Sequence, residues 1–88
     1  GILADVALGW LEVHVLWVEP AQRSAGVGAT LLEACQRKAR ESGAHSARLD
    51  TFDWQAEGFY ARRGYVVFAR LGDYPPGHER VFMSKRLV

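Results

Sequence analysis

The residues best suited to chemistry in this chain lie between positions 18 and 28, which read Val-Glu-Pro-Ala-Gln-Arg-Ser-Ala-Gly-Val-Gly. Here the end of an apolar strand joins the start of an amphipathic helix. Because Gly26 and Gly28 have no Cβ atom, the backbone N–H groups at the helix start can approach an anion closely. A lone Gly-x-Gly is more often a tight turn without a ligand, so this pattern alone leaves two interpretations open: a turn and a pyrophosphate site.

The segments on either side of this junction have different periods. Over Trp10–Val18 the spacing is that of a strand, with one face made of Leu11, Val13, Val15 and Trp17 and the other of Glu12, His14, Leu16 and Val18. After the junction the apolar spacing is helical, and one side carries Val27, Leu31, Ala34, Cys35 and Ala39. The chain therefore changes from strand to helix across the candidate site.

The rest of the chain consists of short elements separated by glycine and proline. We expect strands over 2–8, 46–52, 65–71 and 81–87, helices over 26–41 and 53–63, and a loop over 72–78. Gly43 is expected to end the first helix in the left-handed conformation, and Asp53 to cap the second. The predicted fold is α/β, an α+β mixed sheet of about five strands and two helices in the order strand-strand-helix-strand-helix-strand-strand.

The composition is that of one small domain without a strong overall charge. The 88 residues carry 11 basic and 10 acidic side chains, and a net charge of +1 gives no attraction to nucleic acid or to an acidic membrane surface. No apolar stretch reaches the length of a membrane span. Cys35, the one cysteine, is expected to be a buried inert thiol, while His45 and His78 fall in expected loops without metal-ligand spacing. We expect a cytoplasmic protein with no metal, membrane or nucleic-acid partner.

Two motifs resemble those of the GNAT superfamily of N-acetyltransferases. The first is Arg23-x-x-Gly26-x-Gly28, preceded by Leu16-x-Val18. The second is the segment 56–65, Ala-Glu-Gly-Phe-Tyr-Ala-Arg-Arg-Gly-Tyr, which is similar to the family pattern A-x-x-[LF]-Y-x-x-x-G-[FY]. They occur in the family's order, and the resemblance covers nearly the whole chain from about position 10 to 88. It favours the pyrophosphate interpretation of the glycine pair.

The resemblance implies a shorter domain than the family usually has. A typical member places a strand, two helices and two further strands before the motif strand, whereas only one strand is expected before it here. Residues 1–88 therefore resemble a single truncated GNAT-like acetyltransferase domain that lacks the usual N-terminal strand and helices. Since 49% of the residues are hydrophobic, we expect apolar surface for a partner. That partner is a second copy in a homodimer, formed with or without strand exchange, or else a separate chain.

Acetyl-CoA is the co-substrate that the resemblance implies, and with it come particular contacts. Backbone groups of Leu16, Trp17 and Val18 would pair with the pantetheine amides as a short added strand does. The pyrophosphate would be held by Arg23, Ser24, Ala25, Gly26, Val27, Gly28, Ala29 and Thr30. Further contacts would come from Asp53, where the family often has Asn, from Phe59, and from Arg62 or Arg63.

The resemblance also implies catalytic roles. Tyr60 matches the family's tyrosine, whose hydroxyl can protonate the departing thiolate as a general acid. The attacking amine must be neutral, so a carboxylate or an imidazole has to accept its proton, directly or through water. Glu12 and His14 are the candidates, and Glu12 lies where some members of the family carry a catalytic glutamate. The simpler interpretations are a core aromatic side chain at Tyr60 and a solvated strand face at Glu12 and His14.

We therefore expect an acetyl-CoA-dependent N-acetyltransferase that transfers an acetyl group to a primary amine by direct attack. The segment 73–78, Asp-Tyr-Pro-Pro-Gly-His, resembles a loop of one bacterial subgroup, in which Tyr74 and His78 would line the acceptor site unless Tyr74 only packs on the prolines. The alternative from another class is a non-catalytic CoA-binding or structural dimerisation module. A third is a fragment that folds by dimerising and binds nothing.

Overall fold

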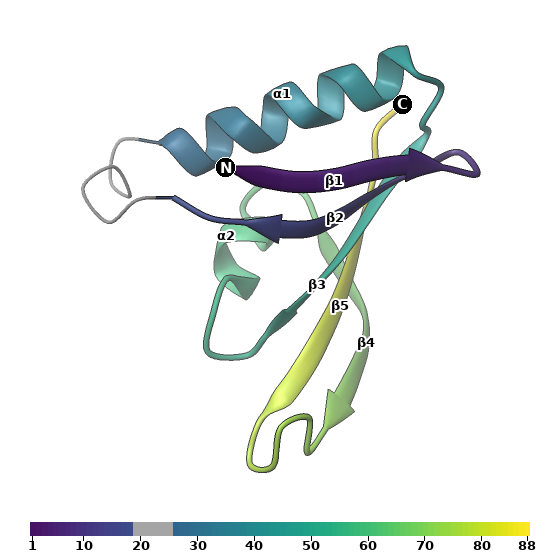
Figure 1. Ribbon diagram of the computed structural model, residues 1–88. Helices are drawn as coiled ribbons and strands as arrows, with labels where there is room; N and C mark the ends of the chain where they lie inside the picture. The colour runs from purple at the N-terminus through teal and green to yellow at the C-terminus, as the bar shows by residue number, and fades with distance from the viewer. Residues whose placement is uncertain (19–25) are drawn as a thin grey trace. The chain divides into compact units, whose positions relative to one another are not determined.

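A computed structural model describes residues 1–18 and 26–88, and these form a mixed α/β fold (Figure 1). The elements are β1 (Ile2–Ala7), β2 (Trp10–Leu16), α1 (Val27–Glu41), β3 (Ser46–Phe52), α2 (Glu57–Ala61), β4 (Val66–Gly72) and β5 (Glu79–Arg86). The hydrogen-bonded strand order is β1-β2-β3-β5-β4. The predicted element order and fold class are confirmed. No helix among these residues is long and apolar enough to cross a membrane.

The chain divides into two compact units. The first comprises Gly1–Ala47 and Arg86–Val88, and the second Arg48–Lys85. In the first unit, α1 packs along the antiparallel β1–β2 hairpin (Figure 1). The buried helix residues are Gly28, Leu32, Gln36 and Ala39. Of the apolar side that the sequence predicted, only Ala39 is buried. Val27, Leu31, Ala34 and Cys35 are half-buried, because the buried face is displaced by about one position and includes the polar Gln36.

A β-bulge interrupts the alternation of β2. Leu3 pairs with Val15 and Ala4 with Val13, so His14 is the extra residue of β2 with no partner on β1. An inserted residue reverses which side chains face the core. Leu11 and Val13 are buried before the bulge, but Val15 after it is exposed. The expected face of four alternating apolar residues is therefore wrong in its second half.

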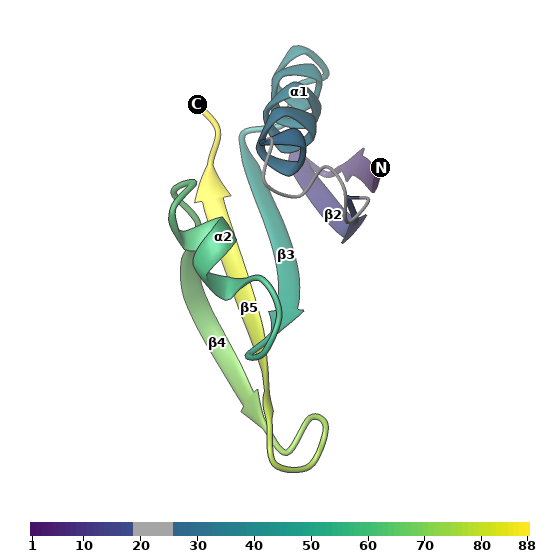
Figure 2. The same cartoon turned by 90° about the vertical axis from the view of Figure 1, so that its left-hand side faces the viewer.

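In the second unit, α2 is held against the antiparallel β4–β5 hairpin (Figure 2). The ammonium of Lys85 on β5 donates to the carbonyl of Arg63, 2.8 Å away, just after the helix. The core of this unit consists of Leu49, Tyr60, Tyr65, Val81 and Met83. Every residue of β4 is exposed, which suits its place at the edge of the strand order.

The second helix begins later than the sequence predicted. It starts at Glu57 after an N-cap residue, Ala56, that makes no side-chain cap bond. Asp53 is therefore not the helix cap. Its carboxylate instead accepts the backbone N–H of Glu79, 3.0 Å away. The local sequence predicted a cap because Asp is a favourable N-cap residue. Asp53 instead serves as the acceptor for a backbone N–H at the start of β5.

The end of α1 is as predicted. The helix closes at Ser42, and Gly43 has a φ of 95°, in the left-handed region that favours glycine. A Cβ atom built on Gly43 meets nothing within 4 Å, so a side chain there would cost only backbone strain.

We predict that Gly43→Ala lowers the free energy of unfolding by about 1 kcal/mol, the cost of a left-handed L-residue. For a domain of this size that is a fall of about 4–8 °C in Tm, measured by circular dichroism. Gly72→Ala is the matched control, because Gly72 also has open space around a Cβ but no positive φ. An equal loss in both variants would contradict the assignment to backbone strain.

Candidate functional site

The first part of the candidate site is the start of α1. Gly26 is the N-cap residue with a φ of 74°, and a Cβ there would meet nothing within 4 Å. Its carbonyl accepts the backbone N–H and the hydroxyl of Thr30, both 3.1 Å away. By helix geometry the N–H groups of Val27, Gly28 and Ala29 have no partner inside the helix. The first turn has no acidic residue, so nothing in it repels an anion.

Glycine is needed at position 26 for the backbone conformation, not for close packing in the free protein. Among residues 1–18 and 26–88, none occupies the space where a side chain at position 26 would lie. Thr30 uses its hydroxyl hydrogen within the turn, so the hydroxyl contact that the sequence suggested would require Thr30 to change partner. Arg23, Ser24 and Ala25, the other expected phosphate contacts, lie outside the described residues.

The second part is the end of β2, where the sequence predicted backbone contacts to a pantetheine arm. Leu16 is the last strand residue and pairs with Ile2. The N–H of Trp17 donates to the carbonyl of Gly1, 2.9 Å away. This donor is therefore already used within the first unit, and the indole ring of Trp17 is exposed. Leu16 and Val18 are half-buried.

Three titratable side chains gather on one side of the β1–β2 hairpin. Asp5 pairs directly with Glu12 across the strands, and the bulge brings His14 to the same side. His14 Nε2 lies 2.8 Å from Asp5 Oδ2, and one ligand atom from each residue lies within 4.8 Å of the others. Glu12 and His14 are thus neighbours, as predicted. Asp5 was missed, although the hairpin register around Leu8-Gly9 would have placed it opposite Glu12.

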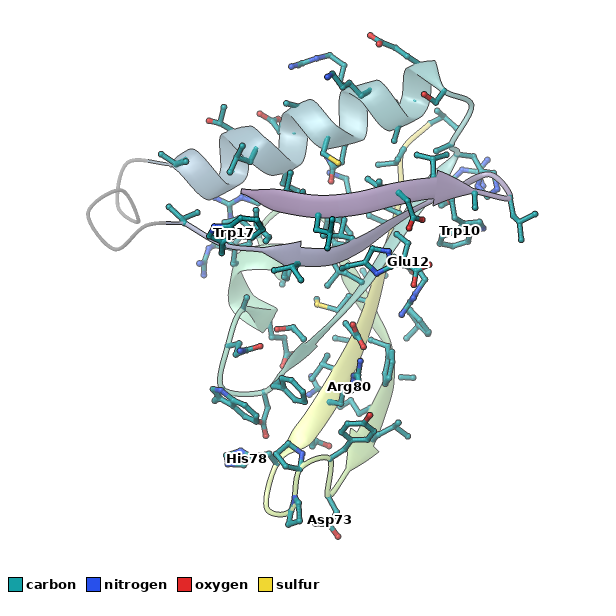
Figure 3. The ribbon with its side chains drawn as sticks, in the orientation of Figure 1. Trp10, Glu12, Trp17, Asp73, His78 and Arg80 are labelled. Carbon is teal, nitrogen blue, oxygen red and sulfur yellow. The ribbon has the colours of Figure 1, made fainter. Side chains whose placement is uncertain are left out.

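Asp5, Glu12 and His14 also have the oxygen and nitrogen donors of a divalent cation site. Asp5 and His14 are exposed, and Glu12 is half-buried. Of the three, Glu12 is the least exposed. Figure 3 shows Glu12 on β2, the strand that also carries Trp10.

Tyr60, the predicted proton donor, lies on α2 in the core of the second unit. It is buried, and its ring makes edge contacts with Phe59 at 5.1 Å and Tyr65 at 5.6 Å between centroids. Burial raises the pKa of the Tyr60 hydroxyl above its ordinary value of 10. The hydroxyl therefore keeps its proton at neutral pH, which is the state a general acid needs. The core interpretation and the catalytic one both fit this position.

The two arginines that follow Tyr60 differ in their surroundings. Arg63 donates to the carbonyl of Phe59 at 2.9 Å, and its guanidinium lies 4.0 Å from the centre of the Phe59 ring. One face of Phe59, an expected cofactor contact, is thus already covered. Arg62 is exposed, and its side chain makes no hydrogen bond or ion pair within residues 1–18 and 26–88. Of the two, Arg62 is the one that can reach a phosphate without breaking a contact.

Asp53 is occupied on both carboxylate oxygens. One accepts the backbone N–H of Glu79, and the other lies 3.0 Å from His78 Nδ1. The expected cofactor contact at Asp53 would have to share these oxygens. His78 lies in the loop before β5, as Figure 3 shows. It contacts Asp53 although 25 residues separate the two, so spacing along the sequence could not show this pairing.

An ion pair and a set of aromatic rings surround the beginning of β5. Arg80 Nε donates to Asp50 on β3 at 2.6 Å, and a second guanidinium nitrogen donates to the Tyr74 hydroxyl at 2.7 Å. The Arg80 guanidinium also lies 4.8 Å from the centre of the Tyr74 ring. Hydrogen bonding to Asp50 raises the pKa of Arg80. Tyr74 is therefore held by Arg80, and Arg80 and Asp50 are positions that the sequence did not single out.

Cys35 and His45 play structural parts. Cys35 on α1 is half-buried where the sequence predicted a buried thiol, and desolvation raises the pKa of that thiol. His45 lies edge-on to the Trp10 ring, 5.5 Å between centroids, and its Nδ1 lies 2.9 Å from the Ser46 hydroxyl.

Comparison with known proteins agrees with this arrangement of motifs. Residues 1–67 match the family model described as an acetyltransferase (GNAT) domain. Blasticidin-S acetyltransferase of Streptomyces morookaense is 40% identical over 88 residues, which are 99% of this chain and 65% of that protein. An acetyltransferase of Agrobacterium fabrum is 33% identical over 86 residues, 98% of this chain and 63% of that one. The chain thus spans less than two thirds of these curated relatives.

Solved structures show the same fold. The crystal structure of an acetyltransferase from Bacillus cereus superposes with a TM-score of 0.92 at 33% identity, over 97% of this chain and 61% of that one. An aminoglycoside 6′-N-acetyltransferase complexed with coenzyme A has a TM-score of 0.89 at 18% identity, over 99% of this chain and 65% of that one, and shares the fold alone. With a family model matched over most of its length, the chain belongs to the GNAT acetyltransferase family.

Proposed function

We propose that this chain is an acetyl-CoA-dependent N-acetyltransferase that transfers the acetyl group to a primary amine by direct attack. The observation that carries the proposal is the start of α1, where a left-handed Gly26 leads into a first turn whose N–H groups have no partner inside the helix and which holds no acidic residue. That arrangement suits the pyrophosphate of CoA. Family membership supports the choice of acetyl-CoA over another anionic ligand.

In the proposed reaction Glu12 accepts a proton from the acceptor ammonium, directly or through water. The neutral nitrogen then attacks the thioester carbonyl carbon, so that a C–N bond forms and the C–S bond breaks. Tyr60 donates its hydroxyl proton to the departing thiolate and is reprotonated by the second proton that leaves the nitrogen. One proton is released overall, from Glu12.

The acceptor is proposed only as a primary amine. The most similar relatives described above include one named for blasticidin S, and a solved nourseothricin acetyltransferase is 25% identical over 99% of this chain and 56% of that one, with a TM-score of 0.86. These names make blasticidin S and nourseothricin the first compounds to include in an acceptor screen, beside simple amines and amino acids.

We predict that acetyl-CoA raises the Tm of the wild-type chain. A ligand at a hundredfold excess over its Kd adds about 2.7 kcal/mol to the free energy of unfolding, which for a domain of this size is a rise in Tm of about 10 °C or more.

Arg62→Ala is expected to weaken acetyl-CoA binding about tenfold, since a hydrogen bond to a charged group is worth about 1.5–3 kcal/mol. The Kd is measured by titration calorimetry.

Arg63→Ala is the matched control for this binding experiment. Its loss removes the contacts with Phe59, so the free protein should melt about 4–8 °C lower, with little change in the Kd for acetyl-CoA. No shift of the wild-type Tm at millimolar acetyl-CoA would remove the basis of the proposed function.

For turnover, we predict that Tyr60→Phe lowers kcat by about a hundredfold or more, the usual contribution of a general acid. The Kd for acetyl-CoA should change by less than about twofold, because the ring stays in place. Glu12→Gln is expected to lower kcat and to flatten the acidic limb of the pH profile. Release of CoA thiol measures both. Unchanged turnover in Tyr60→Phe would leave the tyrosine as a core residue.

A non-catalytic CoA-binding module is the second candidate. It accounts for the same helix start, and it predicts an acetyl-CoA shift in Tm with no acetylation of any amine. The turnover experiment separates the two.

We also propose that the protein is a homodimer through the edge strand β4. Val66, Phe68 and Leu71 on β4 are exposed, Phe68 by 58%, and an apolar edge strand favours pairing with another strand. Sedimentation velocity at micromolar concentration should show a dimer, and Phe68→Lys should convert it to a monomer that keeps its circular dichroism spectrum. A wild-type monomer would exclude this interface.

A further inference from the structure

Three rings at one end of the second unit form a continuous surface that the proposed transfer does not use. Phe52, the last residue of β3, stacks on Trp54 with 4.6 Å between centroids and 11° between planes. His78 meets Trp54 at 65°, also with centroids 4.6 Å apart. We call Phe52, Trp54 and His78 the aromatic shelf. Trp54 remains 52% exposed although one face is stacked.

The contact with Asp53 selects one tautomer of the neutral His78 ring. A carboxylate only accepts hydrogen bonds, so in the neutral ring Nδ1 is the donor nitrogen. Nε2 then carries the lone pair, and the side chain is 48% exposed. The other nearby charges have partners of their own: Arg80 binds Asp50, and Asp73 accepts the N–H of Gly77 at 3.4 Å. The shelf thus offers an apolar ring face beside a hydrogen-bond acceptor.

The shelf lies close along the chain to the proposed proton donor. Trp54 and Tyr60 are six residues apart, of which the last few are helical. With a rise of about 1.5 Å per helical residue and at most about 3.6 Å per extended one, their Cα atoms are within about 15 Å of each other. The shelf and the proposed proton donor are therefore neighbours along the chain within the second unit.

We propose that the aromatic shelf binds a planar ring of the amine acceptor, with the ring lying on Trp54 and a hydrogen-bond donor on its edge meeting His78 Nε2. The proposal rests on the proposed acetyl transfer and names the class of its acceptor: an aromatic or heteroaromatic amine with a polar edge. Stacked and edge-on aromatic pairs are worth about 0.5–1.5 kcal/mol beyond the area they bury, so the shelf discriminates planar rings from saturated ones of equal size.

The first experiment compares 2-phenylethylamine with 2-cyclohexylethylamine as acceptors. The wild-type protein should prefer the aromatic amine by about two- to twelvefold in KM, the equivalent of that pair energy. Trp54→Leu should abolish the preference and Trp54→Phe should retain part of it. Trp10→Leu is the control in the first unit and should leave the preference intact.

The second experiment tests the polar edge with tyramine against 2-phenylethylamine. The wild-type protein should prefer tyramine, whose phenol can donate to Nε2. In Asp53→Asn the amide oxygen stays with the Glu79 N–H, so the amide NH₂ faces His78 Nδ1 and moves the ring proton to Nε2. The preference for tyramine should then be lost while the circular dichroism spectrum stays that of the folded wild type. This readout would not move if Asp53 served the fold alone.

Failure of the shelf and failure of the proposed function give different results. The shelf is also read without acetyl-CoA, by quenching of tryptophan fluorescence with blasticidin S in the wild type and in Trp54→Leu. Quenching that depends on Trp54 supports the shelf even if no amine is acetylated. Turnover with an unchanged aromatic preference in Trp54→Leu overturns it. A dimer that becomes a monomer in Trp54→Leu also overturns it, since the shelf would then be a contact between two copies.

Discussion

The carboxylate of Asp53 is the interaction on which the second unit depends. It joins the end of β3 to the start of β5 by accepting one hydrogen bond from a backbone N–H and one from His78. A net gain of about 1.5–3 kcal/mol for each bond to a charged group compares with about 1–2 kcal/mol to order one residue's backbone. Two such bonds therefore offset the ordering of only a few residues. The stack of Phe52 on Trp54, the turn bond from Gln55 to Phe52 and the buried core of the unit add to them.

The contacts of Asp53 affect both α2 and the loop before β5. On one side it fixes where α2 begins and hence where Tyr60 enters the core. On the other it fixes the tautomer of His78 and the surface next to Trp54. An Asp used as a helix cap, as local propensity favoured, would have left His78 and the N–H of Glu79 without this acceptor. The long-range bond prevails because an unpaired backbone N–H costs about as much as a cap contributes and the carboxylate serves two donors at once.

Sequence reasoning predicted the element order, the strand-to-helix junction and the family from two motifs, because those features are encoded by local period and by glycine. It did not predict what depends on one inserted residue or on contacts between distant segments. The bulge at His14 reverses the facing of β2 beyond Val13, and no two-residue period can show such an insertion. The pairings of Asp53 with His78 and of Asp50 with Arg80 join residues 25 and 30 positions apart, so spacing along the chain could not find them.

The two parts of the candidate site illustrate different ways of preparing for a ligand. At the start of α1 the site is prepared because groups there lack partners within the helix. The first N–H groups have no intrahelical acceptor, position 26 is glycine, and the first turn has no carboxylate. At the aromatic shelf it is the reverse, since Asp53, Phe52 and the turn hold Trp54 and His78 before any ligand arrives. Ordering exposed rings in advance lowers the entropy lost on binding, so affinity there depends less on contact area than on how firmly Asp53 holds the cluster.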